Sequence, residues 1–238
     1  MMENGLLHLT LITFIRYLIY IGIFAGILIL LFFLFRIPKN IFRKLLHIAA
    51  FTSPVYIALT GEGWLPDTLT LILFAAVVWP ALSIAEHLNI YGDLFVEKRP
   101  GEVKNSLLLL FLSQAAFTAF CLGVMKRPYI LIAACMAWGF GDIAAAWIGR
   151  PFGKHKVRLP FADPNKSWEG TAAMFAVAFP SCLICLLLFS GYSLIPAVLI
   201  SLLTGLVSAF SELISKNGND TIVVPLADIL ILSLTALL

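Results

Sequence analysis

Long apolar runs, separated by shorter polar segments, extend along nearly the whole chain. A membrane-spanning helix needs about 20 consecutive, mostly apolar residues. Runs near this length occur at eight places: 14–35, 48–60, 68–88, 106–124, 129–148, 171–189, 194–214 and 222–238. The second run is short, and if it is re-entrant the number of spans is seven. The pattern predicts an all-α, polytopic membrane bundle of about eight transmembrane helices, with seven as the alternative.

The amino-acid composition supports this prediction. Of the 238 residues, 61% are hydrophobic and 12% are charged, and the mean hydropathy is +1.00. A soluble domain has roughly 25% charged residues, and a single core of this size could not bury so much apolar surface. We therefore expect an integral membrane protein in which residues 1–238 form a single membrane domain. The net charge is only +3 and gives no indication of nucleic-acid binding.

Lysines and arginines collect on one side of the predicted bundle, which indicates its orientation. With eight spans, one side holds three cations, Arg16, Lys126 and Arg127. The other side holds thirteen: Arg36, Lys39, Arg43, Lys44, Lys98, Arg99, Lys104, Arg150, Lys154, Lys156, Arg158, Lys166 and Lys216. Because the cationic side faces the cytoplasm, both termini are predicted to be non-cytoplasmic. The predicted cytoplasmic loops are 36–47, 89–105, 149–170 and 215–221. Seven spans would break this alternation, which favours eight.

Asp142 is an acid inside a predicted span, close behind Gly139 and Gly141. An ionised carboxylate at membrane depth costs several kcal/mol unless it is paired, hydrated or bound to a metal. Glu212, Asp220 and Asp228 are three further acids near the predicted cytoplasmic ends of the last two spans. We expect all four to lie at one level and to build one interfacial site.

The loop 149–170 is rich in cations and glycines and leads into the start of a predicted helix. Such a loop suits the binding of a polyphosphate. The alternative is a basic loop that only sets the orientation of the chain, and charge alone does not separate the two. The nearby acids favour phosphate chemistry, because phosphoryl transfer needs Mg²⁺, carboxylates to hold it and cations on the remaining oxygens.

Two polar groups lie in the first half of the chain. Arg43, Lys44 and His47 are spaced by three and four residues, so they share one side of a helix. They are either part of the site or an anchor at the membrane interface. Glu86 is either the partner of a buried cation or a polar residue at a helix end.

Four segments, "RKLLH", "GDIAAAWIGRPFGKHKV", "NKSWEGTAAMF" and "ELISKNGNDTIVVPLAD", resemble the polyprenol kinase family. This family includes dolichol, phytol and farnesol kinases and the CTP-dependent diacylglycerol kinases. The chain is similar, more distantly, to the phosphatidate cytidylyltransferases. The resemblance covers residues 43 to about 228.

The resemblance implies an enzyme that transfers the γ-phosphate of CTP to the hydroxyl of a membrane lipid alcohol, with Mg²⁺ or another divalent cation. The motif positions carry the catalytic and metal-binding roles to Asp142, Asp220 and Glu212. They carry nucleotide and phosphate binding to Arg43, Lys44, His47, Arg150, Lys154, Lys156, Lys166, Ser167 and Glu169. The chain departs from the family pattern at Thr221, where an asparagine is usual.

Two alternatives stay open at this stage. A cytidylyltransferase, which makes a CDP-lipid, needs the same ingredients. A small ion-coupled transporter would use Asp142 and Glu212 as a cation relay, although the acids lie near one face and no repeated pair of broken helices is visible. The sequence does not indicate the lipid alcohol or the oligomeric state.

Overall fold

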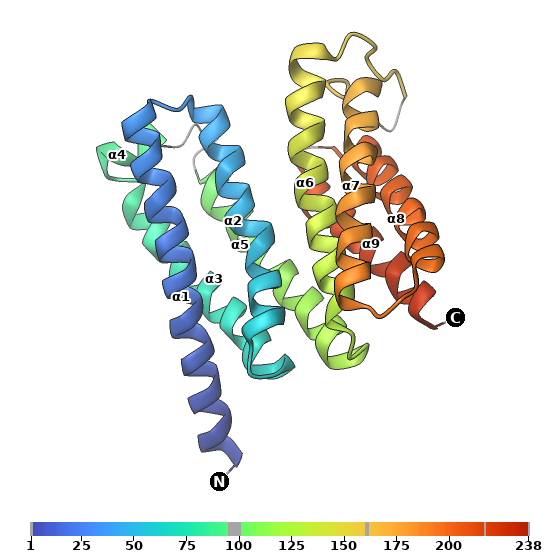
Figure 1. Ribbon diagram of the computed structural model, residues 1–238. Coiled ribbons are helices and arrows are strands. Elements are labelled where there is room, and N and C mark those ends of the chain that lie inside the picture. The colour runs from blue at the N-terminus through green and yellow to red at the C-terminus, as the bar shows by residue number, and fades with distance from the viewer. Residues whose placement is uncertain (1, 95–100, 160–161, 217, 238) are drawn as a thin grey trace. The chain divides into compact units, whose positions relative to one another are not determined.

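The computed structural model describes residues 2–94, 101–159, 162–216 and 218–237, without the side chains of 2–4, 39–40, 43–44, 89–90 and 93. Within these residues the secondary structure is helical, apart from one isolated antiparallel bridge between Lys156 and Ser167. The predicted all-α fold is therefore confirmed. The chain divides into two compact units, Met1–Val124 and Met125–Leu238 (Figure 1). The expectation of one membrane domain stays a prediction.

The first unit consists of helices joined by short connections. They are α1 (Met2–Phe35), α2 (Lys39–Thr60), α3 (Trp64–Ala85), α4 (Asn89–Leu94) and α5 (Glu102–Thr118), and α5 continues as the π-helix η1 (Ala119–Val124). Helix α1 packs against α2 and α3, and α3 packs against α5 and η1. The first helix begins well before the predicted run, and parts of the predicted loops 36–47 and 89–105 are helical. Residues 95–100 of the second loop lie outside the described residues.

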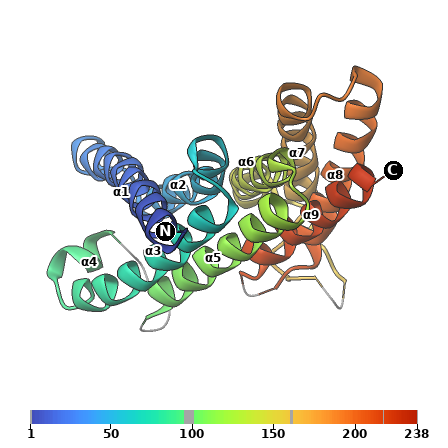
Figure 2. The ribbon, with the colours of Figure 1, turned by 90° about the horizontal axis from the view of Figure 1, so that it is seen from below.

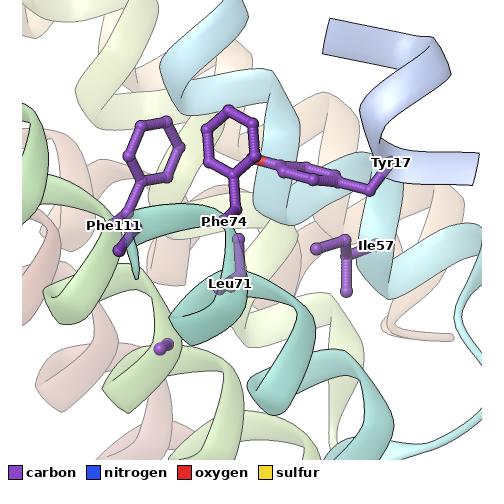
Figure 3. Packing of buried hydrophobic residues seen from close by; sticks show 7 residues of the cluster. Tyr17, Ile57, Leu71, Phe74 and Phe111 are labelled. Atoms are coloured by element: carbon purple, nitrogen blue, oxygen red, sulfur yellow. The ribbon is translucent and has the colours of Figure 1, made fainter. Parts of the chain in front are cut away.

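Aromatic side chains from three helices form the core of the first unit (Figure 3). The ring of Phe74 on α3 meets Tyr17 of α1 edge-on at 5.0 Å between centroids, and meets Phe111 of α5 at 4.7 Å. Ile57, Leu71, Ala75 and Ala115 are the other buried members of this cluster. Such aromatic pairs add about 0.5–1.5 kcal/mol each beyond the area that they bury, and here they join helices that are far apart in the sequence.

The second unit is a bundle of four long helices: α6 (Pro128–Phe152), α7 (Trp168–Phe189), α8 (Leu194–Ile214) and α9 (Asp220–Leu237). Helix α6 packs against α7 and α9, and α8 packs against α7 and α9 (Figures 1 and 2). Gly141 permits the close approach of α6 to α7, because a Cβ atom there would lie 2.5 Å from Met174 Sδ. Small residues at membrane helix contacts commonly have this role.

Seven helices of the described chain are long and apolar enough to cross a membrane. They are Gly5–Phe35, Trp64–Ala85, Glu102–Val124, Pro128–Phe152, Trp168–Phe189, Leu194–Ile214 and Asp220–Leu237. The second predicted run falls on α2, whose apolar part, Leu45–Thr60, is shorter. Of the two predicted span counts, seven is thus the number that length and composition support. The orientation of the spans stays a prediction.

Candidate active site

Lys166 lies at the junction of three elements of the second unit. Its ammonium group binds Oε1 of Glu212, in the last turn of α8, and lies 3.6 Å from Oδ2 of Asp220, the first residue of α9. Only 5% of the Glu212 surface is exposed. An ionised carboxylate that is buried without a cation would be strongly unfavourable. Lys166 therefore stabilises the ionised form of Glu212 in its buried position.

Asp142, on α6, belongs to the same electrostatic group. Asp142 and Asp220 both lie near enough to Glu212 for their negative charges to act on its carboxylate. Lys166 contacts two of these acids, Glu212 and Asp220. That all three build one site stays a prediction. We use the name acid cluster for Asp142, Glu212 and Asp220.

The acid cluster has the donor chemistry of a magnesium site. Among the described residues, no three His, Cys, Asp or Glu side chains are close enough to hold a metal ion by themselves. Mg²⁺ does not require such a cage, because it is usually held by one or two carboxylates together with water and substrate phosphates. The carboxylates of Asp142 and Asp220 have this chemistry, and Lys166 binds Glu212 directly and lies 3.6 Å from Oδ2 of Asp220.

The loop between α6 and α7 places Lys166 by folding back on itself. Val157 N donates to Lys166 O at 3.1 Å, beside the bridge between Lys156 and Ser167. Val157 is also buried in a small cluster with Ala162 and Leu213. Because Leu213 directly follows Glu212 in α8, this apolar contact holds the loop next to the acid cluster.

Glycines bring the two ends of this loop together. A Cβ atom on Gly153 would overlap the carbonyl oxygen of Gly149 and lie 2.5 Å from Ser167 Oγ. Ser167 is buried, and its hydroxyl accepts a hydrogen bond from Gly170 N at 3.2 Å, which caps α7. The structure thus gives Ser167 a helix-capping contact, and its predicted role in nucleotide binding stays a prediction.

The predicted phosphate-binding cations of the loop are exposed to solvent. Arg150 lies in the last turn of α6, and Lys154 and Lys156 follow in the loop. Lys156 Nζ donates to the backbone oxygen of Asn165 at 3.2 Å. Their charges are therefore available to an anion that approaches from solvent.

Glu169, in the first turn of α7, contacts a residue that sequence reasoning missed. His155 Nδ1 lies 2.6 Å from Glu169 Oε1, and His155 N donates to both carboxylate oxygens at 3.1 and 3.3 Å. One signal in the sequence could have indicated this contact: Glu169 is an acid within a basic segment, and such an acid needs a partner. Its predicted role in nucleotide binding is untested.

Asp228 does not share the contacts of the other acids. It is completely buried in α9, and Ser208 Oγ of α8 lies 2.7 and 2.8 Å from its two carboxylate oxygens. Asp228 thus links α8 to α9 inside the bundle. The expected gathering of the four acids into one site stays a prediction.

The predicted site residues of the first unit lie on α2. The side chains of Arg43 and Lys44 are outside the described residues, and His47 is half-buried. Their part in a site stays a prediction. Of the two readings of Glu86, the structure supports that of a cation's partner. Lys104 Nζ donates to Glu86 Oε2 at 2.6 Å and lies 5.6 Å from the centre of the Trp79 ring.

Comparison with known proteins defines the class to which this chain belongs. It is a member of the cytidylyltransferase family, whose model matches residues 4–215. It is also 29% identical over 204 residues to the phytol kinase of Synechocystis sp., an alignment that covers 82% of this chain and 78% of that protein. No solved structure matches the chain significantly. The predicted family resemblance is confirmed, and it implies a transferase that uses CTP and a lipid substrate.

Proposed function

We propose that this protein is a CTP-dependent lipid-alcohol kinase, which transfers the γ-phosphate of CTP to the hydroxyl of a membrane lipid such as a polyprenol, a phytol-type alcohol or diacylglycerol. The observation that carries the proposal is the contact of Lys166 with Glu212 and Asp220, directly beside the exposed cations of the α6–α7 loop. Carboxylates and cations in one place are the two components that phosphoryl transfer requires.

In the proposed reaction, Arg150, Lys154 and Lys156 bind the triphosphate and neutralise its charge. Asp142 and Asp220 would hold Mg²⁺, which supplies positive charge to the phosphate oxygens when it is bound. Lys166 keeps Glu212 and Asp220 in place while the nucleotide binds. Catalysis of this kind depends on positioning and electrostatic stabilisation, with no covalent intermediate on the protein.

The relative of known activity supports transfer to a lipid alcohol. The phytol kinase of Synechocystis sp. aligns with most of this chain, and the aligned length includes both units. The lipid alcohol would present its hydroxyl at the membrane interface, where the exposed loop also lies in the proposed arrangement.

A second candidate function follows from the family description. A cytidylyltransferase would use a lipid phosphate to attack the α-phosphate of CTP, and would release pyrophosphate. The match to the cytidylyltransferase family over residues 4–215 favours this candidate, and the same cations and acids would serve it.

The two reactions are separated by the position of a label in CTP. Detergent-purified protein with Mg²⁺ is given a panel of lipid alcohols and phosphatidic acid, with CTP labelled at the γ-phosphate in one series and at the α-phosphate in another. The proposal predicts that only the γ label enters lipid, and that the panel identifies the alcohol. Entry of the α label alone would identify a cytidylyltransferase. Transport of ions into liposomes without nucleotide turnover would contradict both.

A further inference from the structure

The ring of His155 is fixed in orientation and yet open to solvent. Nδ1 is held 2.6 Å from Glu169 Oε1, and the backbone oxygen of His155 accepts a hydrogen bond from Trp168 N at 3.0 Å. Despite these contacts, 79% of the side chain is exposed. The loop thus presents an oriented imidazole to whatever binds outside it.

The contact with Glu169 determines which ring nitrogen remains available. An ionised carboxylate can only accept a hydrogen bond. The proton shared in this contact therefore belongs to Nδ1 of His155, which donates it to Glu169. In the neutral ring, Nε2 then has a lone pair and can accept a proton. A carboxylate that orients a histidine in this way is the usual support of a general base.

The neighbours of His155 suit the two substrates of the proposed reaction. Lys154 and Lys156 flank it, and both side chains are exposed and suited to phosphate. Phe152 precedes His155 by three residues, and Trp168 N donates to His155 O; their side chains are 62% and 52% exposed. Exposed aromatic side chains next to charges are typical of the membrane interface, where the hydroxyl of a lipid alcohol is found. The loop around His155 thus carries both cations suited to the nucleotide and exposed aromatic side chains suited to the lipid.

We propose that His155 is a catalytic residue that accepts the proton of the lipid hydroxyl, and that Glu169 is its positioning residue. The inference rests on the proposed kinase function. In this step the hydroxyl proton moves to Nε2 as the lipid oxygen forms a bond to the γ-phosphorus. The bond from that phosphorus to the oxygen bridging the β- and γ-phosphates breaks, and CDP leaves with the electron pair. The proton on Nε2 is later released to water.

The test compares His155→Gln and His155→Ala with wild-type protein in the γ-phosphate transfer assay. General acid–base catalysis contributes about 10²- to 10⁴-fold, so we expect kcat to fall by about this factor, with KM for CTP unchanged. Added imidazole should restore part of the activity of His155→Ala. Glu169→Gln should lower kcat by about 10- to 100-fold, as is typical when an orienting partner is lost.

His87→Gln is the matched control, because the Nδ1 atom of His87 also contacts a protein oxygen, Ser83 O at 3.0 Å, on an exposed surface. It should retain wild-type kcat. The inference is wrong if His155→Gln keeps wild-type kcat, or if it raises KM for CTP at unchanged kcat, since the ring would then only bind phosphate. Absence of γ-phosphate transfer by the wild-type protein would instead contradict the proposed function.

Discussion

The ammonium group of Lys166 binds the carboxylate of Glu212, a residue 46 positions away in the chain. This ion pair ties the loop before α7 to the end of α8, and the side chains of its two members are only 17% and 7% exposed. We expect both the local fold and the proposed chemistry to depend on this contact.

Lys166→Met should destabilise the second unit and abolish activity. Removing one partner of a buried ion pair costs about 3–5 kcal/mol, because the other charge is left uncompensated. The solvent-exposed part of Lys166 places the expected loss near the lower end, about 3 kcal/mol. Unfolding followed by circular dichroism in detergent measures the loss.

The double variant Lys166→Met/Glu212→Leu tests the cause of that loss. Replacement of both charges by apolar groups should recover most of the stability and none of the activity. Equal instability of the single and double variants would show that the ion pair itself is not the source of the effect.

Gly153→Ala should distort the loop, because the added methyl group would overlap Gly149 O and contact Ser167 Oγ. Overpacking of this kind costs about 1–3 kcal/mol. Thermal unfolding should show a lower midpoint. Gly26→Ala is the control, because the new Cβ atom would have no neighbouring atom within 4 Å. It should not lower the midpoint.

Ser208→Ala should destabilise the bundle without an effect on nucleotide binding. Asp228 is completely buried, and Ser208 contacts both of its carboxylate oxygens. The loss of a partner for a buried polar group costs about 1–3 kcal/mol. Chemical unfolding measures the effect, and Ser113→Ala, which removes only a hydroxyl bonded to the Leu110 carbonyl, should cost less. Equal costs would show that Asp228 does not depend on Ser208.

Lys154→Gln combined with Lys156→Gln should raise KM for CTP about 100-fold or more at unchanged stability. Both side chains are exposed, so they contribute little to folding, whereas each charge-assisted contact to phosphate is worth about 1.5–3 kcal/mol. Steady-state kinetics with CTP as the varied substrate measures the change. Lys126, an exposed cation two residues before α6, is the control, and Lys126→Gln should leave KM for CTP unchanged. An equal rise in KM there would indicate a general charge effect.

The sequence predicted the long helices well because hydropathy over about 20 residues is a strong signal. It also predicted that Asp142, Glu212, Asp220 and Asp228 converge, since an acid at membrane depth requires a partner. It could not name Lys166 as the partner of Glu212 and Asp220. The position of Lys166 depends on the packing of the loop, through Val157, against Leu213. Nothing in the two sequence segments indicates that they contact each other.

Other differences have similar physical reasons. Asp228 shares a helix with Asp220, but its place two turns further along α9 puts it inside the bundle against Ser208. The family resemblance carried nucleotide binding to Ser167 and Glu169, and this role stays a prediction. The contacts that the structure gives them, a helix cap and an imidazole, could not be read from the motif. Hydropathy gives the helix positions, whereas the partner of a polar side chain depends on tertiary packing.

The measurement that tests the account most directly is single-turnover γ-phosphate transfer from CTP by wild-type protein and by Asp142→Asn, each checked for folding by circular dichroism. Glu62→Gln, an exposed acid paired with Arg16, is the control. The account predicts γ label in lipid for the wild type and the control, and none for Asp142→Asn at unchanged folding. Wild-type transfer by Asp142→Asn would contradict the assignment of the acid cluster as the centre of the reaction.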